Sequence, residues 1–177
     1  MCARANAEDG DSTGHTHGAE PVEFRLMRQE EVAQVSDLAL RVFAECVGPS
    51  FDPQGVETFA RYADPEELAR RSQHDHSVLV ATVQESIVGV IELREHQHIS
   101  LLFVDKPHQR RGIARELLTR ALELSCSQGH QVRKVTVNSS PYAVPVYQRL
   151  GFCALGPEQS KSGMLFTPMS LTVADEA

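Results

Sequence analysis

The spacing of hydrophobic residues predicts a chain that mixes strands and helices. Hydrophobic and polar residues alternate over residues 22–28, which is typical of a half-buried strand. Hydrophobic residues then recur at helical spacing over residues 30–47, and again over residues 53–71 with a break at Asp64-Pro65. Asp64 can accept hydrogen bonds from backbone N–H groups, and Pro65 suits a first helical position. We therefore expect a second helix to begin there.

The middle of the chain predicts consecutive strands over residues 77–83, 86–93 and 98–104. A short turn between the first two indicates a hairpin. The third is hydrophobic from Ile99 onward, as expected for a strand covered on both faces. A helix is expected next, over residues 112–128. The remaining segments predict a strand, a short helix and two closing strands, at residues 132–137, 142–150, 152–155 and 164–173.

This order of elements predicts an α/β fold, an α+β mixed sheet of about seven strands flanked by about four helices. A single domain over residues 21–175 accounts for these elements and is long enough to bury a core. Residues 1–20 carry no large hydrophobic side chain after Met1, so we expect a flexible N-terminal tail. His15 and His17 in that tail have no partners spaced to complete a metal site, and we predict no metal.

The composition narrows the classes of function. The chain has 177 residues and a net charge of −7, which argues against broad electrostatic binding of nucleic acid. No hydrophobic run approaches the roughly 20 residues that span a bilayer, so we expect no membrane contact. A secretory signal is also absent, and the expected location is cytoplasmic. The four cysteines are far apart in sequence and are expected to be reduced thiols.

The segment between the third central strand and the helix at residues 112–128 has the features of a phosphate-binding loop. A helix start leaves backbone N–H groups without partners and stabilises an anion. Gly112 has no Cβ to block a phosphate, and Ala114 is also small. Cations gather here in an acidic chain, which favours a ligand with several phosphates: Lys106, Arg110, Arg111 and Arg115. The alternative is a solvated basic helix start, but strand, loop, small residues and helix occur in the order the motif needs.

Two motifs resemble those of the GNAT superfamily of N-acetyltransferases. The first fits that family's Gln/Arg-x-x-Gly-x-Gly/Ala pattern and consists of Gln109, Arg110, Arg111, Gly112, Ile113 and Ala114. The second, from Tyr147 to Phe152, resembles a short helix that ends in Leu-Gly-Phe. The order of elements from Val22 to Val173 is also similar to the family's, so the resemblance covers most of the chain.

The resemblance implies a GNAT-like fold of the acyl-CoA N-acyltransferase type, with acetyl-CoA as the co-substrate and no metal. It implies that the pyrophosphate binds the backbone N–H groups of the first motif. The candidate side chains for the phosphates are Arg110, Arg111 and Arg115. By position, the strand edge that would pair with the pantetheine arm consists of Leu102, Phe103 and Val104.

Tyr147 is our candidate for the acid that protonates the leaving thiolate. The resemblance places a tyrosine near the thioester sulfur, and a phenol carries its proton at neutral pH. The alternative is a packed tyrosine whose hydroxyl binds backbone. Pro145 departs from many relatives and is compatible with the short helix if that helix begins near Val144. Asn138, expected after the strand at residues 132–137, is a candidate for contacting the cofactor arm or the acceptor, or else it caps a turn.

Several groups are candidates for deprotonating the amine. His98 begins the third central strand and, by the two-residue period, is expected to share a face with Ser100, Leu102 and Val104. Glu92 on the preceding strand is the alternative, directly or through a water molecule. For each residue the competing interpretation is a plain surface or hydrogen-bonded role. A chain of water molecules without a dedicated base is a further option.

These features predict an N-acetyltransferase that moves an acetyl group from acetyl-CoA to a primary amine of an unidentified acceptor, a small molecule or a protein. The alternatives are a non-catalytic acyl-CoA-binding or regulatory module, and transfer of a longer acyl group. We expect the first two helices and residues 48–52 and 158–163 to determine the acceptor. The negative net charge slightly favours a cationic acceptor. A homodimer is a possible assembly, since many relatives form one.

Overall fold

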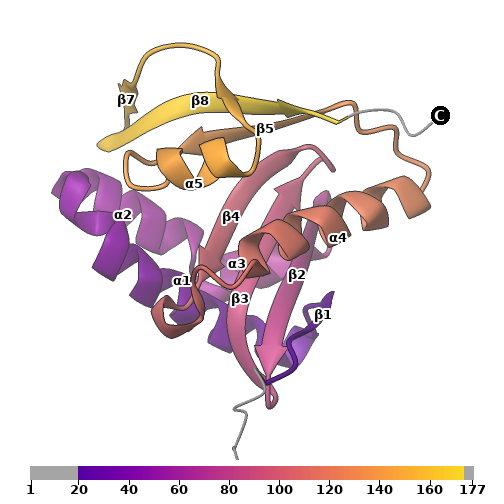
Figure 1. The fold of residues 1–177 in the computed structure, drawn as a ribbon. Helices are drawn as coiled ribbons and strands as arrows, with labels where there is room; N and C mark the ends of the chain where they lie inside the picture. The colour runs from indigo at the N-terminus through magenta and orange to yellow at the C-terminus, as the bar shows by residue number, and fades with distance from the viewer. Residues whose placement is uncertain (1–19, 174–177) are drawn as a thin grey trace, which may run out of the picture.

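The computed structural model describes residues 20–173, so nearly all of the predicted tail, with His15 and His17, lies outside the described residues. Eight strands form a mixed sheet in the order β1-β2-β3-β4-β5-β8-β6, with β7 paired to β8 (Figure 1). The strands are β1 (Glu23–Leu26), β2 (His76–Val83), β3 (Ser86–Arg94), β4 (His98–Val104), β5 (Lys134–Ser139), β6 (Cys153–Ala154), β7 (Gln159–Lys161) and β8 (Met164–Thr172). The helices are α1 (Val32–Cys46), α2 (Pro53–Tyr62), α3 (Pro65–Ser72), α4 (Ile113–Ser127) and α5 (Val144–Arg149). Short 3-10 helices are η1 (Gln29–Glu31), η2 (Gly48–Ser50) and η3 (Lys106–His108).

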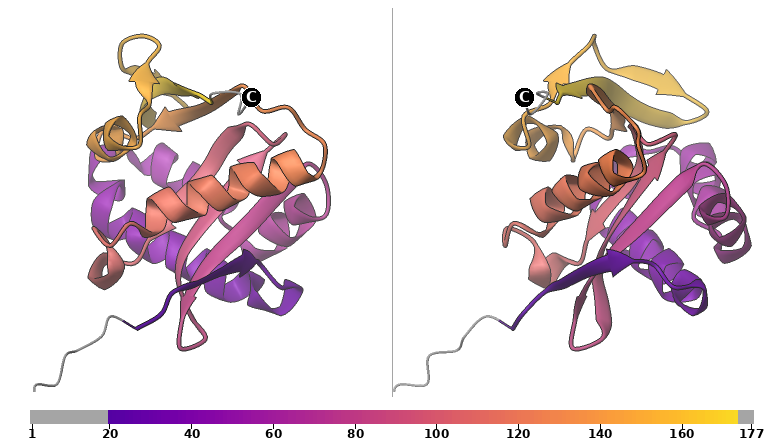
Figure 2. Two further views of the ribbon diagram at one scale, coloured as in Figure 1. Left: turned by 45° about the vertical axis from the view of Figure 1, so that its right-hand side comes forward. Right: turned by 90° about the vertical axis from the view of Figure 1, so that its right-hand side faces the viewer.

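Helices cover both faces of the sheet, which confirms the predicted fold class (Figure 2). On one face, α4 packs against β2, β3 and β4, with Leu117 and Ile91 in its hydrophobic core. On the other, α1 packs against β3 and β4 and α3 against β2, with a core that contains Leu38, Leu68 and Val90. We call these the α4 face and the α1 face. Each face buries its own hydrophobic cluster, and this burial is the main source of stability.

The two central parallel strands, β4 and β5, separate after a short contact. They pair only at His98 with Thr136 and at Ile99 with Val137. Beyond these pairs, β4 continues beside β3, while β5 continues beside β8. The sheet therefore opens between β4 and β5 along the C-terminal half of β4, and both α4 and α5 lie beside this opening in Figure 1.

A β-bulge lies in β4 at the point where the strands separate. Leu93 pairs with Ile99 and Glu92 pairs with Leu101, which leaves Ser100 without a partner on β3. An extra residue in a strand reverses the alternation of the side chains that follow. Ile99 accordingly belongs to the core of the α4 face, whereas Leu101 belongs to that of the α1 face.

This bulge makes one prediction wrong. His98 was expected to share a face with Leu102 and Val104 by a strict two-residue period, but both pack on the same face as its neighbour Ile99. Coverage of β4 is also less complete than predicted. Leu102 and Phe103 are only half-buried, because they lie where β4 has separated from β5.

Two local predictions bear on the placement of functional residues. Pro145 lies in the first turn of α5, which begins at Val144, so its missing N–H costs no helical hydrogen bond. Asn138, in contrast, does not follow β5 but lies within it, opposite Pro168. β5 extends further than predicted because β8 pairs with it along its whole length.

The predicted break between the second and third helices at Asp64 is confirmed, because the Asp64 carboxylate accepts from the N–H groups at the start of α3.

The loop between β7 and β8 packs against the start of α2. The Asp52 N–H donates to the Gly163 carbonyl at 3.3 Å, and the Asp52 carboxylate accepts from the Gly55 N–H at 2.8 Å. The Gly55 backbone and the Gly163 carbonyl approach so closely that a Cβ on Gly55 would overlap the carbonyl group. This contact joins the C-terminal hairpin to the α1 face.

Gly55→Ala is expected to lower the free energy of unfolding by about 1–3 kcal/mol, the usual cost of overpacking, although alanine favours helix more than glycine does. Urea unfolding measures this change. Gly156→Ala is the matched control, because a Cβ there meets nothing within 4 Å. Equal stability of the two variants would show that the α2–hairpin contact is not tight in solution.

Candidate active site

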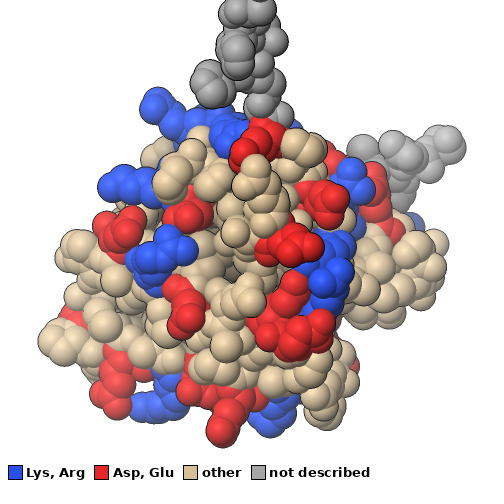
Figure 3. Space-filling model, turned by 90° about the horizontal axis from the view of Figure 1, so that it is seen from below, with Lys and Arg blue, Asp and Glu red and all other residues tan. Residues whose placement is uncertain are grey.

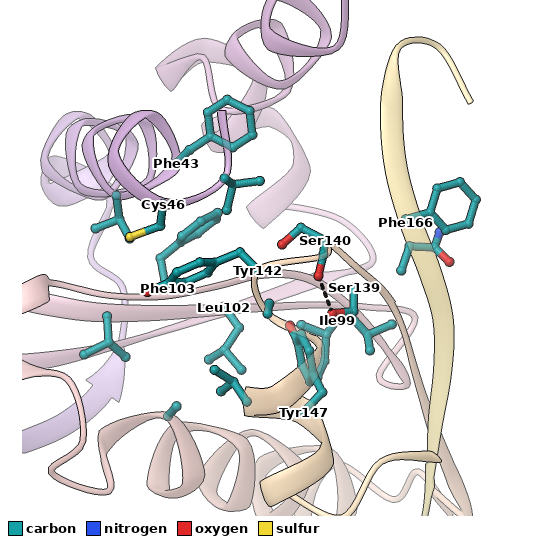
Figure 4. A pocket seen from close by; sticks show the side chains of 18 of the residues that line it. Phe43, Cys46, Ile99, Leu102, Phe103, Ser139, Ser140, Tyr142, Tyr147 and Phe166 are labelled. Atoms are coloured by element: carbon teal, nitrogen blue, oxygen red, sulfur yellow. Dashed lines mark hydrogen bonds between the residues drawn. The ribbon is translucent and has the colours of Figure 1, made fainter. Parts of the chain in front are cut away.

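A groove runs through the sheet where β4 and β5 separate. It contains a cavity of about 1170 Å³, somewhat larger than the usual range for ligand sites and large enough for an extended ligand. Residues of α1, α2 and β4 line it toward the α1 face, and residues of α4, α5 and the loop before α4 line it toward the α4 face. Figure 4 shows Leu102 and Phe103 of β4 facing Ser139 and Tyr147 from the C-terminal half of the chain. The groove therefore has an end on each face of the sheet.

The end on the α4 face is formed by the predicted phosphate loop. Gly112 has a φ of 82° and is the N-cap of α4, and Arg110 has a φ of 63°. Among residues 20–173, no protein acceptor is found for the backbone N–H groups of six consecutive residues, Arg110 to Arg115. A run of free N–H donors at the start of a 15-residue helix is suited to a large anion.

The side chains of the loop have different roles from its backbone. Gln109 donates from Nε2 to the Val104 carbonyl at 3.0 Å and so ties the loop to the end of β4. Arg115 donates from Nη2 to the Arg149 carbonyl at 2.7 Å and joins α4 to α5. Arg110 and Arg115 line the groove, but Arg111 does not. Gly112, Ile113 and Ala114 line it as well.

The edge of β4 that faces the opening is free of backbone pairing to β5 from Ser100 to Val104, within the described part of the chain. Leu102, Phe103 and Val104 line the groove. A polar chain laid along this edge can exchange hydrogen bonds with the strand as a neighbouring strand would. The structure thus brings the predicted strand edge and the predicted phosphate loop into one continuous groove.

Tyr147 reaches the same groove from α5. Its side chain is 6% exposed, and its ring packs edge-on against Phe152 with centroids 5.3 Å apart. No protein group within residues 20–173 hydrogen-bonds the Tyr147 hydroxyl, and its oxygen is not completely buried. Burial raises the pKa of the Tyr147 phenol above its usual range. The hydroxyl is therefore protonated at neutral pH and free to donate into the groove that Tyr147 lines. Figure 4 shows the Tyr147 side chain among the residues that line this groove.

Glu92 does not line the groove but lies in a buried polar network on the α1 face. Its carboxylate is fully buried and accepts from Arg71 Nε at 3.0 Å and from the Tyr62 hydroxyl at 3.1 Å. His76 Nδ1 lies 2.8 Å from the same carboxylate. Because these partners occupy its oxygens, the geometry favours the structural interpretation of Glu92 over the role of base.

His98 does not line the groove either. Its Nδ1 lies 2.8 Å from the Thr136 hydroxyl, across the short β4–β5 contact. Burial, and then the charge of Arg94, lower the pKa of its imidazole. The ring is thus neutral near pH 7 but holds the two strands together rather than facing the cavity. Both candidate bases are placed away from the reacting groups that the groove can hold.

Other lining residues carried no motif in the sequence. Asn138, a candidate either for contacting the cofactor arm or the acceptor or for capping a turn, lines the groove from inside β5. Tyr142, half exposed, also lines it and interacts with Cys46 of α1, a hydrogen bond that raises the pKa of its phenol. Phe43, Phe51 and Phe59 line its α1 side. Phe43 was expected only as a core residue of the first helix, whereas Phe51 lies in residues 48–52, which were expected to help determine the acceptor.

The described residues show no membrane-spanning helix and no metal-binding cluster. No helix within residues 20–173 is both long and hydrophobic enough to cross a bilayer. Among the same residues, no group of three or more His, Cys, Asp or Glu side chains is arranged to hold a metal ion. On the face shown in Figure 3, acidic and basic side chains are interspersed, so that face presents no continuous basic surface for nucleic acid.

Comparisons with known proteins agree with this geometry. The sequence profile of the acetyltransferase (GNAT) domain matches residues 47–173. An uncharacterized N-acetyltransferase of Escherichia coli K12, YafP, is 27% identical over 133 residues, which cover 74% of this chain and 81% of that protein. Spermidine N(1)-acetyltransferase of Vibrio cholerae is 28% identical over 110 residues, which cover 56% of this chain and 64% of that protein.

A solved structure extends the comparison to the fold. The crystal structure of PaiA N-acetyltransferase from Thermoplasma acidophilum, in complex with coenzyme A, superposes with a TM-score of 0.72. Its sequence identity is 18%, and the match covers 86% of this chain and 99% of that one. Fold and profile together show that this chain belongs to the GNAT acetyltransferase family. The resemblance inferred from the two motifs is thereby confirmed, and acyl transfer is the activity that the family indicates.

Proposed function

We propose that this chain is an N-acetyltransferase that moves an acetyl group from acetyl-CoA to a primary amine. One observation carries the proposal: six consecutive free N–H donors at the start of α4 open into the same groove as the Tyr147 hydroxyl. The first feature suits a diphosphate and the second suits a leaving thiolate. A groove that only bound coenzyme A would not need a free, protonated phenol within it.

The residues of the groove fit the parts of coenzyme A in order. The N–H groups of the loop would hold the pyrophosphate, and Arg110 would add a cation beside it. The edge of β4 at Leu102 to Val104 would pair with the amides of the pantetheine arm, except at the Val104 carbonyl, which accepts from Gln109. Asn138 lies across the opening from this edge and can offer its amide to the same arm. Acetyl-CoA would supply an activated acetyl thioester to the middle of the groove.

The chemistry that remains for the protein is the movement of two protons. As the amine nitrogen bonds to the acetyl carbon, the carbon–sulfur bond breaks and the sulfur takes a proton from the Tyr147 hydroxyl. The amine must also lose a proton. No Asp or Glu side chain lines the groove among the described residues, and neither His98 nor Glu92 reaches it. We therefore assign this role to water in the groove, which carries the proton to solvent. Tyr147 regains its proton from solvent after the products leave.

Acetyl-CoA is expected to raise the melting temperature of the protein, because it binds only the folded chain. At about 100 times its dissociation constant the stabilisation is about 2.7 kcal/mol, which corresponds to roughly 5–10 °C for a domain of this size. Gly112→Glu should abolish most of this shift, since it places a carboxylate where the phosphates bind. Differential scanning fluorimetry with acetyl-CoA, and with coenzyme A alone, measures both effects.

Gly129→Glu is the matched control for this experiment. Gly129 lies just beyond the C-terminal end of α4, has a φ of 87° and, like Gly112, has open space around a Cβ. Both variants therefore carry the same backbone strain, and only Gly112→Glu changes the groove. If the wild-type protein shows no shift at millimolar acetyl-CoA, or if the two variants respond alike, the assignment of the loop is wrong.

A further inference from the structure

The end of the groove on the α1 face has an aromatic wall, which we define as Phe43, Phe51, Phe59 and Phe103. The Phe43 and Phe59 rings stack with centroids 3.9 Å apart and planes 9° apart. Phe51 meets Phe43 edge-on at 5.5 Å, and Phe103 meets Phe59 edge-on at 5.6 Å. All four line the groove, and three of them are half-buried while Phe43 is buried behind them. The rings form one connected hydrophobic surface drawn from α1, the segment before α2, α2 and β4.

The charged residues of the groove are distributed unevenly. Among the described residues that line it, none is Asp or Glu. Arg110 and Arg115 lie near the start of α4, and Arg149 lies at the C-terminal end of α5. Lys161 lies on the β7–β8 hairpin. The acidic side chains that give the chain its net charge of −7 are therefore not among the described residues that line the groove. This removes the argument from net charge for a cationic acceptor.

An acceptor with several ammonium groups is poorly matched to this end of the groove. Each buried ammonium needs a carboxylate or several acceptors to offset its lost hydration. A hydrophobic wall instead stabilises an apolar body, and aromatic rings pack against aromatic ligands in edge-on or offset arrangements. Apolar surroundings also disfavour the charged form of a single amino group held beside the wall, and the neutral form that remains is the nucleophile.

We propose that the acceptor is a primary amine carried on an aromatic or similarly bulky hydrophobic body, and that the aromatic wall determines this choice. The inference rests on the proposed function, since it assigns the second substrate of the same groove. It also distinguishes this chain from its Vibrio cholerae relative, whose name refers to spermidine, a polyamine. The wall lies on the face opposite the phosphate loop, so acceptor and donor would enter from opposite sides of the sheet.

The test is a steady-state assay with acetyl-CoA and three acceptors: 2-phenylethylamine, tryptamine and spermidine. Release of free thiol and formation of the N-acetyl product are both measured. We expect kcat/KM for each aromatic amine to exceed that for spermidine by at least about 100-fold, a discrimination within the reach of one well-formed pocket. A preference for spermidine, or equal rates for all three, would overturn the proposal.

A second measurement tests the wall itself. Phe51→Ala should raise KM for 2-phenylethylamine by about tenfold, while the dissociation constant of acetyl-CoA stays within about twofold. Phe24→Ala, a half-buried phenylalanine of β1 outside the groove, is the matched control and should leave both constants unchanged. An equal effect of the two variants on KM would contradict a role for the wall.

Failure of the inference can be told apart from failure of the proposed function. If acetyl-CoA raises the melting temperature but only spermidine is acetylated, the acceptor class is wrong and the transferase stands. If hexanoyl-CoA is used much faster than acetyl-CoA and Phe51→Ala removes that preference, the wall holds an acyl chain and the proposal is overturned. If acetyl-CoA does not bind at all, both conclusions fall together.

Discussion

Glu92→Ala is expected to lower the free energy of unfolding by about 3–5 kcal/mol, the usual cost of removing one member of a buried ion pair. The Arg71 side chain is 9% exposed and Glu92 is 0% exposed, so the variant leaves a guanidinium buried without its carboxylate. Tyr62 loses its acceptor as well, although its ring stays stacked under the Arg71 guanidinium at 3.7 Å. Urea unfolding at neutral pH gives the change in free energy.

Glu57→Ala provides the comparison for this experiment. Glu57 also pairs with an arginine, Arg61, but both side chains are 74% exposed, so the expected loss is below about 1 kcal/mol. A double variant, Arg71→Leu with Glu92→Leu, should be more stable than Glu92→Ala because no buried charge is left unpaired. A loss below about 1 kcal/mol for Glu92→Ala would mean that water reaches the network and that its burial is incomplete.

The spacing of hydrophobic residues could predict the helices and strands, and the two motifs could predict the general position of the groove. Periodicity depends on neighbours within a turn or a few strand residues, and α1, α4 and β4 were found close to their predicted bounds. The phosphate loop was also readable, because its strand, glycine and helix are contiguous in the chain. These are local features, and local features are what a single sequence records well.

The bulge at Ser100 could not be read from the sequence. Residues Ile99 to Val104 are almost all hydrophobic, so either side of the strand can face a core and the pattern does not reveal an extra residue. The bulge is specified by the pairing of β4 with β3, and it changes the face of the residues that follow. The predicted orientation of His98 relative to Leu102 was wrong for this reason.

The role of Glu92 required contacts between distant segments. Its partners Tyr62, Arg71 and His76 lie 16 to 30 residues earlier, on α2, α3 and the start of β2. The sequence therefore favoured a surface or hydrogen-bonded role for Glu92 over the role of base, but it could not identify the partners. The aromatic wall also depends on distant segments, because its four phenylalanines come from α1, the segment before α2, α2 and β4 and meet only in the folded chain.

Tyr147→Phe is expected to lower kcat by about 100-fold, at the lower end of the effect of a general acid. The substitution is unusually clean, because the ring keeps its contact with Phe152 and the hydroxyl has no protein partner within residues 20–173. Melting temperature and the dissociation constant of acetyl-CoA should therefore stay unchanged. A loss confined to kcat identifies an interaction made in the transition state rather than in substrate binding.

Tyr142→Phe separates this role from a general effect of hydroxyl groups in the groove. Tyr142 also lines the groove, but its hydroxyl interacts with Cys46 of α1, so its loss should change kcat by less than about threefold. If both variants lose turnover equally, the groove needs hydroxyl groups only for packing or solvation. If Tyr147→Phe keeps full turnover with a good acceptor, the thiolate takes its proton from water, and Tyr147 is a packing residue of α5.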